Sequence, residues 1–315
     1  MGRLIDGEWV AKGVDPRKSS GKFNRTETQF RNWIQADNSS EFPAEKNRYH
    51  LFVSHACPWA HRTMIFRKLL GLEDIISVTY VEPMMLENGW EIRGSSPIEE
   101  AKFMYHVYQA AEPFYSGQAS VPVLWDKQKA TIVSNESSEI IRMLNNGFKD
   151  LSNSYYDFYP QGYRAEIDVL NDRIYHTLNN GVYKCGFARQ AEPYVESFDL
   201  LFETLDWLEE KLSHQRYLLK YGISEADWRL FTTLVRFDAV YHGHFKCNLR
   251  RLIDYPDLSN YLRDLYQVPG IADTVELNEI KTHYYGSHDY VNPSRIVPKG
   301  PLLDFMAPHN RARFE

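Results

Sequence analysis

Cys57 stands where the residue types of this sequence favour nucleophilic chemistry. An apolar run at residues 49–53 is typical of a strand, and Ile65 and Leu69 follow at helical spacing. Pro58 fits the first turn of that helix, because this position needs no N–H donor. Cys57 is therefore expected at a helix N-terminus, where unpaired N–H groups and the helix dipole favour a thiolate. The alternative is a buried structural cysteine, but the Cys-Pro pair at a strand-to-helix junction favours the reactive interpretation.

A nucleophilic role for Cys57 requires a thiol that is ionised at neutral pH. Free cysteine has a pKa of about 8.5, and a pKa of about 6 requires roughly 3.4 kcal/mol of differential stabilisation. A helix terminus supplies only ~0.3–1 kcal/mol, and at best ~2 kcal/mol. Hydrogen bonds to a charged group are worth roughly 1.5–3 kcal/mol each. We therefore expect one or two hydroxyl donors close to the sulfur.

The residue three positions after Cys57 is Ala60, not a second cysteine. A disulfide cannot form across this turn, so a mixed disulfide on Cys57 needs an outside thiol to resolve it. The sequence thus predicts a one-cysteine enzyme that works with a small-molecule thiol. A cysteine hydrolase is a weaker alternative, because it requires an imidazole base and His55 is the nearby candidate.

The composition limits the classes of partner. The chain has 315 residues, 43% of them hydrophobic, which is enough for one large or two ordinary domains. A net charge of −6 argues against nucleic acid as the main partner. Three cysteines do not make a disulfide scaffold, so a reducing, cytoplasmic compartment is expected. Residues 1–6 lack a signal-peptide core, and no apolar run approaches the roughly 18 residues of a membrane span. Cys185 and Cys247 lack metal-ligand spacing, so no metal site is expected.

Residues 48–146 alternate between strand and helix signals. The expected elements are strands at 49–53, 75–81 (parallel to the first), 120–125 and 131–133, with helices after Cys57, near 99–110 and from about 135. Pro122 interrupts the third strand, and a cis Val121–Pro122 bond at its start would explain it. Asn135 or Ser137 is expected to cap the last helix. This order of elements is the thioredoxin-like arrangement.

The remaining segments differ in character. Residues 1–47 are polar, and Gly13, Pro16, Ser19, Ser20 and Gly21 predict an irregular, solvated surface extension. Residues 147–159 are expected to be a linker, and residues 160–276 to form an all-helical domain. Its helix signals include a capping box at 224–227 and apolar positions around 167–178, 195–212 and 258–265. Residues 277–315 are predicted to form a polar, aromatic tail that packs through its tyrosine rings.

Several motifs together resemble the xi-class glutathione transferases, which are the glutathionyl-hydroquinone reductases. The motifs are Cys-Pro-Trp-Ala-His-Arg at 57–62, Glu-Asn-Gly-Trp at 87–90, Val-Pro-Val-Leu-Trp-Asp at 121–126, Ser-Asn-Glu-Ser at 134–137, Asn-Asn-Gly-Val-Tyr-Lys at 179–184, Leu-Val-Arg-Phe-Asp at 234–238 and His-Tyr at 283–284. The resemblance covers nearly the whole chain. It implies the glutathione transferase layout: a thioredoxin-like α/β domain followed by an all-α domain, with homodimers common.

The resemblance also assigns roles to matching residues. It implies Cys57 as nucleophile, Tyr183 as general acid/base, and Tyr241 and Tyr284 as hydroxyls that help to lower the pKa of the thiol. For glutathione it implies Trp90 packing on the tripeptide, Gln118, Ala119, Ser120 and Val121 pairing through their backbone, and Glu136 and Ser137 holding the γ-glutamyl end. Gln118 stands where the family is expected to have a basic residue.

The implied reaction removes glutathione from an aromatic glutathionyl-hydroquinone through a Cys57–glutathione mixed disulfide, which a second glutathione resolves. Glutathione is thus a co-substrate, and no metal takes part. Two alternatives remain open at this stage. An omega-like thiol transferase or dehydroascorbate reductase would share Cys57 and glutathione without needing Tyr183. A non-catalytic glutathione-transferase-like binding protein would keep a Cys57 of ordinary pKa.

Overall fold

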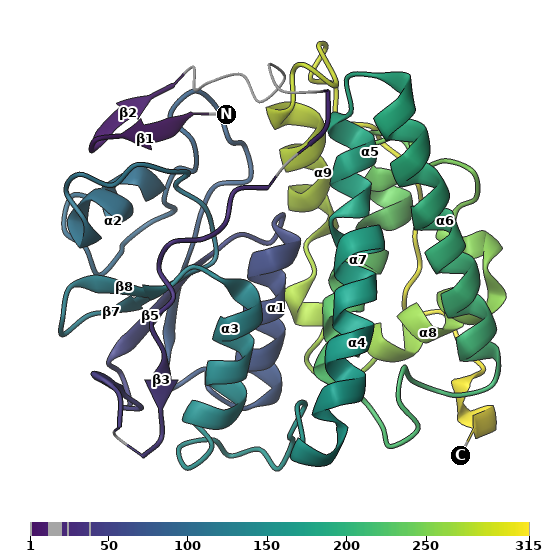
Figure 1. The fold of residues 1–315 in the computed structure, drawn as a ribbon, viewed down its shortest axis with the longest axis horizontal. Helices are drawn as coiled ribbons and strands as arrows, with labels where there is room; N and C mark the ends of the chain where they lie inside the picture. Colours follow the sequence, from purple (N-terminus) through teal and green to yellow (C-terminus); the bar gives the residue numbers. More distant parts are fainter. Residues whose placement is uncertain (1, 12–20, 24, 38, 315) are drawn as a thin grey trace. The chain divides into compact units, whose positions relative to one another are not determined.

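The computed structural model describes residues 2–11, 21–23, 25–37 and 39–314, and the chain divides into two compact units. The N-terminal unit comprises Met1–Asp15 and Thr26–Tyr156, and the helical unit comprises Pro16–Arg25 and Asp157–Glu315. Figure 1 labels strands β5, β7 and β8 of the main sheet in the first unit and helices such as α6 and α7 in the second. The division falls inside the segment predicted as a linker, and the described residues 21–23 and 25 of the predicted N-terminal extension group with the helical unit.

The core of the N-terminal unit is a sheet with strand order β6-β5-β7-β8. Strand β5 (Tyr49–Val53) runs parallel to β6 (Ser77–Tyr80) and antiparallel to β7 (Val123–Asp126), which pairs antiparallel with β8 (Thr131–Ser134). Every residue of β5 is buried, as expected for a central strand covered on both faces. The predicted parallel pairing of the first two strands is confirmed.

Three helices flank this sheet in the predicted order: α1 (Pro58–Leu69), α2 (Met104–Ala111) and α3 (Ser137–Arg142), which a π-helical segment η2 (Met143–Gly147) extends. Helix α1 begins at Pro58, as predicted. Helix α2 begins later than predicted. The N–H groups of Lys102 and Phe103 donate to Nδ1 of His106 (3.1 and 3.3 Å), and this contact holds Phe103 in an extended conformation.

The predicted N-cap of α3 was wrong. Neither Asn135 nor Ser137 caps this helix; the cap is Glu136, whose carboxylate accepts from the N–H of Ser138 at 3.0 Å. The physical reason is that both predicted caps are engaged elsewhere. The Asn135 amide donates to a tyrosine hydroxyl, and the Ser137 hydroxyl accepts from a buried arginine.

The N-terminal extension contains regular structure that the sequence reasoning missed. Strands β1 (Arg3–Ile5) and β2 (Glu8–Val10) form an antiparallel hairpin, and two-residue strands β3 (Ile34–Gln35) and β4 (Phe42–Pro43) pair in parallel. Leu4 is fully buried and exchanges backbone hydrogen bonds with Gly117 (2.9 and 3.0 Å). The prediction of an irregular, solvated extension was therefore wrong for this hairpin. Of the residues that suggested it, Gly13, Pro16, Ser19 and Ser20 lie outside the described residues.

The helical unit has no strand within its described residues, as predicted. Its elements are η3 (Gln161–Tyr163), α4 (Arg164–Ile174), η4 (Tyr175–Asn179), α5 (Gly181–Phe187), α6 (Ala191–Ser213), α7 (Glu225–Arg236), η5 (Phe237–Tyr241), η6 (Leu252–Asp254), α8 (Pro256–Tyr266), η7 (Ala272–Thr274), α9 (Leu277–Ser287) and η8 (Arg311–Phe314). The predicted capping box at α7 is confirmed. Ser224 accepts from the N–H of Ala226, and the buried carboxylate of Asp227 accepts from the N–H of Ser224 at 2.8 Å.

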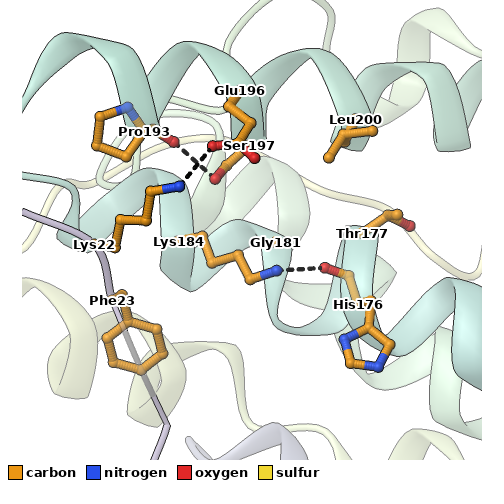
Figure 2. A pocket seen from close by; sticks show the side chains of 10 residues that line it. All are labelled: Lys22, Phe23, His176, Thr177, Gly181, Lys184, Pro193, Glu196, Ser197 and Leu200. Atoms are coloured by element: carbon orange, nitrogen blue, oxygen red, sulfur yellow. Dashed lines mark hydrogen bonds and ion pairs between the residues drawn. The ribbon is translucent and has the colours of Figure 1, made fainter. Parts of the chain in front are cut away.

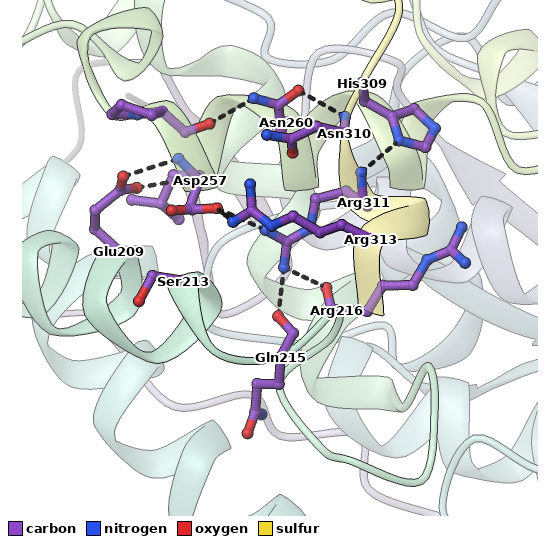
Figure 3. Close-up of polar contacts among 12 residues, drawn as sticks. Glu209, Ser213, Gln215, Arg216, Asp257, Asn260, His309, Asn310, Arg311 and Arg313 are labelled. Atoms are coloured by element: carbon purple, nitrogen blue, oxygen red, sulfur yellow. Dashed lines mark hydrogen bonds and ion pairs between the residues drawn. The ribbon is translucent and has the colours of Figure 1, made fainter. Parts of the chain in front are cut away.

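The predicted C-terminal tail contains α9 and is tied to the rest of the helical unit. The large buried side chains of α9 are Ile280, His283 and Tyr284, and only the first is aliphatic, so the helical period does not stand out as an apolar pattern in the sequence. Figure 3 shows the contacts of the last segment. The fully buried guanidinium of Arg311 donates to Asp257 (2.9 Å) and to the carbonyls of Gln215 and Arg216, the last at 2.9 Å.

Candidate active site

Cys57 occupies the N-cap position of α1, with an extended backbone (φ −79°, ψ 118°). Its carbonyl accepts the first intrahelical hydrogen bond, from the N–H of His61 at 2.9 Å. The half-buried sulfur lies 3.4 Å from the carbonyl oxygen of Val121. This geometry puts the sulfur at the positive end of the α1 dipole, which favours a thiolate.

Val121 belongs to the predicted glutathione-pairing segment, residues 118–121. The Val121–Pro122 peptide bond is cis, as expected from the sequence. Gln118 is exposed, Ala119 and Ser120 are half-buried, and Val121 is buried. Among the described residues, the hydrogen bonds to this segment come from the sulfur of Cys57 and from one tyrosine hydroxyl, which contacts Ser120. The structure therefore brings residue 121 of this segment directly to the cysteine.

Glu136 and Ser137 lie together at the start of α3. The Glu136 carboxylate accepts from the N–H and hydroxyl of Ser138 (3.0 and 2.8 Å) and from the hydroxyl of Thr28 (3.3 Å). Burial alone would raise the pKa of Glu136, but the Ser138 hydrogen bonds and the positive charges of Arg62 and Arg31 outweigh it and leave the pKa below its usual value. Glu136 is therefore an anion at neutral pH.

The hydroxyl of Ser137 is oriented by α1. Nη1 of Arg62, a buried side chain whose guanidinium lies 4.5 Å from the ring centroid of Trp59, donates to Oγ of Ser137 at 3.3 Å. Because Oγ accepts this hydrogen bond, its own hydrogen can donate to another acceptor. Together with Glu136, this arrangement offers one anion and one hydroxyl donor within a single turn.

Trp90 lies on the loop between β6 and α2 and is 8% exposed. Its carbonyl accepts from the first N–H of α2 at 2.9 Å. The N-terminal hairpin supports the same loop, because Nε1 of Trp9 donates to the carbonyl of Glu87 at 3.2 Å. Trp90 thus lies on a loop of the N-terminal unit that has its own anchoring contacts, and it takes no part in the contact between Cys57 and Val121.

The three predicted tyrosines meet in one cluster of the helical unit, here called the tyrosine cluster. The hydroxyl of Tyr284 on α9 lies 2.6 Å from that of Tyr183 on α5 and 3.1 Å from that of Tyr241 on η5. All three rings are buried. Burial raises the pKa of Tyr241 and of Tyr284 well above the usual value, so both remain protonated hydrogen-bond donors.

Phe245 packs against every ring of the tyrosine cluster, with ring centroids 5.5 Å from Tyr183 and 5.6 Å from Tyr241 and Tyr284. This packing depends on Gly186, because a Cβ at that position would lie 2.2 Å from the Phe245 ring. On the other side, the guanidinium of Arg25 lies 5.1 Å from the ring centroid of Tyr183, a cation–π contact. Arg25 thus contacts the tyrosine cluster, as does Phe23, whose ring centroid lies 6.2 Å from that of Tyr183.

Sequence reasoning did not assign a role to several residues that shape these sites. Arg62 had one signal, its place in the Cys-Pro-Trp-Ala-His-Arg motif. Phe245 and Arg25 carried none, because nothing in their spacing relates them to Tyr183. Tyr108, whose hydroxyl contacts Ser120, had no signal either.

A separate pocket of about 190 Å³ lies in the helical unit (Figure 2). It is lined by Lys22, Phe23, His176, Thr177, Gly181, Lys184, Pro193, Glu196, Ser197 and Leu200. Lys22 forms an exposed ion pair with Glu196 at 3.0 Å, and Lys184 donates to the carbonyl of His176 at 3.1 Å. None of the predicted site residues lines this pocket.

The described ranges show no group of three or more His, Cys, Asp or Glu side chains arranged to hold a metal ion. Cys185 and Cys247 are buried, and burial raises the pKa of Cys247 well above its usual value. None of the helices in the described part of the chain combines the length and apolar composition that a membrane crossing needs.

Comparison with known proteins identifies the family. The glutathione S-transferase N-terminal domain model matches residues 56–146, and the C-terminal domain model matches residues 188–264. The glutathionyl-hydroquinone reductase YqjG of Escherichia coli (strain K12) is 51% identical over 323 aligned residues, which cover 99% of this chain and 98% of the relative. The chain belongs to the xi-class glutathione transferases, the glutathionyl-hydroquinone reductase family.

Other members agree with this assignment. The glutathionyl-hydroquinone reductase PcpF of Sphingobium chlorophenolicum is 51% identical, over 96% of either chain. The structure of the xi-class transferase from Natrialba magadii superposes with a TM-score of 0.93 at 45% identity, and covers 100% of this chain and 97% of its own. The glutathione-bound structure of YqjG gives a TM-score of 0.89 at 49% identity over 99% of both chains. The xi-class resemblance and the two-domain layout predicted from the motifs are confirmed.

Proposed function

We propose that this chain removes glutathione from aromatic glutathionyl-hydroquinones through a Cys57–glutathione mixed disulfide. The chain is an enzyme of the glutathionyl-hydroquinone reductase family, and two relatives that share half of its residues carry that name. The observation that carries the mechanism is the place of the Cys57 sulfur, which stands at the N-cap position of α1 and lies beside the Val121 carbonyl. The product hydroquinone is accompanied by glutathione disulfide.

The reaction has two steps, and both balance. The Cys57 thiolate attacks the sulfur of the substrate; a sulfur–sulfur bond forms, the sulfur–aryl bond breaks, and its electron pair with one proton makes the C–H bond of the hydroquinone. A second glutathione, as thiolate, then attacks the mixed disulfide, releases glutathione disulfide and regenerates the Cys57 thiolate. Because position 60 is alanine, the second step needs this external thiol.

Glutathione binding is assigned to the N-terminal unit. The backbone of residues 118–121, which ends beside Cys57, pairs with the tripeptide, and Trp90 packs on it. The anionic Glu136 receives the γ-glutamyl ammonium, and the oriented hydroxyl of Ser137 donates to the neighbouring carboxylate. Gln118 is exposed and uncharged, so it contributes a neutral contact and not an ion pair.

The proton for the aryl carbon is assigned to Tyr183. A phenol is a suitable general acid when it lies within about 3 Å of the reacting atom or one water away. Tyr284 and Tyr241 are assigned, by the family resemblance, as hydroxyl donors that lower the pKa of the thiol; burial keeps both hydroxyls protonated. The hydrogen-bonded order Tyr183–Tyr284–Tyr241 supports this assignment, because each hydroxyl can re-orient its neighbour as a proton is given up.

The charge of Glu136 gives a testable consequence for glutathione affinity. We expect Glu136→Gln to raise the glutathione dissociation constant by roughly ten- to a hundredfold, because a charge-assisted hydrogen bond is lost while the amide oxygen can still cap α3. In the wild type the affinity should stay flat from pH 7.5 to pH 5, since the Ser138 hydrogen bonds and nearby arginines hold the pKa of Glu136 below its usual value and keep the carboxylate ionised. Isothermal titration calorimetry measures both effects.

Thr28→Val is the matched control, because it removes one hydrogen bond to the Glu136 carboxylate (3.3 Å) and keeps the charge. Equal losses of affinity in the two variants would show that the charge of Glu136 plays no part in binding. A glutathione affinity that falls steadily between pH 7 and pH 5 would show that protonation of a group other than Glu136 controls binding.

Product analysis tests the proposed reaction. Incubation of the protein with glutathione and a glutathionyl-hydroquinone should yield hydroquinone and glutathione disulfide in equal amounts by mass spectrometry. A protein that reduces mixed disulfides quickly and leaves the glutathionyl-hydroquinone intact would instead be a thiol transferase. A protein that binds glutathione and turns over neither substrate would be a binding protein.

We further propose that the protein is a cytoplasmic homodimer. Three cysteines without a disulfide fit a reducing compartment. Ile296, Leu302 and Met306 in the segment after α9 are 71%, 99% and 63% exposed, and apolar side chains of this kind suit a subunit interface. Light scattering should give a mass of twice 37.0 kDa; a single chain mass would exclude the dimer.

A further inference from the structure

Tyr108, on α2, joins two segments of the N-terminal unit through one hydroxyl group. Its Oη accepts from the backbone N–H of Ser120 at 3.3 Å and from Nδ2 of Asn135 at 3.1 Å, and it donates to the carbonyl of Ser120 at 3.0 Å. The side-chain oxygen of Ser120 also lies 3.3 Å away. One partner lies in residues 118–121, and the other directly precedes Glu136.

The ring of Tyr108 is held firmly. It is fully buried and packs against Phe30 and Tyr115, with ring centroids 5.9 and 5.0 Å apart. Burial raises the pKa of Tyr108 above its usual value, so the hydroxyl keeps its proton and can donate. A buried ring with a protonated hydroxyl is a rigid attachment point.

The loop that carries residues 118–121 depends on this point. Gly117, at its start, is bonded to Leu4 of the hairpin, and β7 begins at Val123. Within the described residues, two side chains make hydrogen bonds to the loop between Gly117 and Val123. The Cys57 sulfur contacts Val121, and the Tyr108 hydroxyl makes the others, all to Ser120. Without the hydroxyl, the backbone N–H and C=O of Ser120 both lose the hydrogen-bond partner that they have within the described residues.

We infer that Tyr108 is a positioning residue for glutathione, which sets the distance between the backbone of residues 118–121 and the Glu136–Ser137 turn. This inference rests on the proposed function, in which one tripeptide binds both segments. The cysteinyl backbone and the γ-glutamyl end of glutathione are separated by a short covalent linkage, so both segments must be in place at once. A site that is already ordered binds more tightly, because less conformational entropy is lost on binding.

The test compares two buried tyrosines of the same ring cluster. Tyr108→Phe removes the shared hydroxyl and keeps the ring. Tyr115→Phe is the control, because the hydroxyl of Tyr115 makes no hydrogen bond within the described residues. We expect Tyr108→Phe to raise the glutathione dissociation constant about five- to fiftyfold, with the KM for glutathione raised in parallel and kcat at saturating glutathione within about twofold. Tyr115→Phe should change neither.

A second variant keeps the inference testable if Tyr108→Phe folds poorly. Asn135→Ala breaks the link on the Glu136 side alone and should weaken glutathione binding by a smaller factor. The double variant should bind no more weakly than Tyr108→Phe, because both changes break one connection. Binding within twofold of Tyr115→Phe in both single variants overturns the inference. A wild-type protein that fails to bind glutathione in calorimetry overturns the proposed function instead.

Discussion

Cys57→Ala should lower the rate of glutathionyl-hydroquinone reduction by roughly a thousandfold or more. Without the nucleophile the covalent intermediate cannot form at all, which costs more than the loss of a single contact to it. Substrate binding should survive, because Glu136, Ser137 and the backbone of residues 118–121 are unchanged. Single-turnover experiments with the wild type should trap a covalent adduct that is roughly 305 Da heavier than the free protein, the mass added when a glutathionyl group replaces one hydrogen. The variant should show no such adduct.

The control for Cys57→Ala is Cys247→Ala. This change removes a buried thiol, and burial raises the pKa of that thiol well above its usual value. This variant should keep its activity. Alkylation of the wild type by iodoacetamide should modify Cys57 alone, with a rate that rises through an inflection well below the pH of about 8.5 at which free cysteine titrates. An inflection at the free-cysteine value, or substantial reductase activity in Cys57→Ala, would contradict the nucleophile assignment.

Tyr183→Phe should lower the rate of glutathionyl-hydroquinone reduction by about 10²–10⁴-fold, the usual contribution of a general acid. The reason is that cleavage of the sulfur–aryl bond needs a proton at carbon. Exchange between a mixed disulfide and glutathione needs no proton at carbon, so the same variant should reduce a small glutathione mixed disulfide within a fewfold of the wild-type rate. Steady-state kinetics on the two substrates separates these steps.

Tyr194→Phe is a suitable comparison, because the hydroxyl of Tyr194 donates to the carbonyl of Lys246 and takes no part in the tyrosine cluster. It should leave both rates unchanged. Equal losses on both substrates in Tyr183→Phe would mean that Tyr183 acts on the thiolate or on folding, and that the proton comes from another group.

Local patterns in the sequence were sufficient for the features that depend on neighbouring residues. The Cys-Pro pair after an apolar run placed Cys57 at the start of α1, and the Ser224–Asp227 spacing located the cap of α7. The family resemblance gave the three tyrosines of the cluster. Positions 183, 241 and 284 share no spacing rule, so only the resemblance could bring them together before the structure did.

Features that depend on distant partners could not be predicted from the sequence. The cap of α3 was misassigned within Ser-Asn-Glu-Ser, because the choice is made by contacts of Asn135 with α2 and of Ser137 with α1. The hairpin at Leu4 is held by Gly117, far along the chain, and its strands are too short to show a period. Tyr108 carries no motif, and its importance follows only from the contacts of its hydroxyl with Ser120 and Asn135.

The Arg311 contacts bear on the order in which the chain matures during translation. The ribosome makes Arg311 95 residues after Arg216, whose carbonyl it binds, and domains generally begin to fold as they emerge. The residues that follow α6 and the start of α8 therefore gain this partner only after residue 311 has been made. Until then, the carboxylate of Asp257 and the carbonyls of Gln215 and Arg216 lack the guanidinium that joins them, so this part of the helical unit is completed only after α8 and α9 have been synthesised.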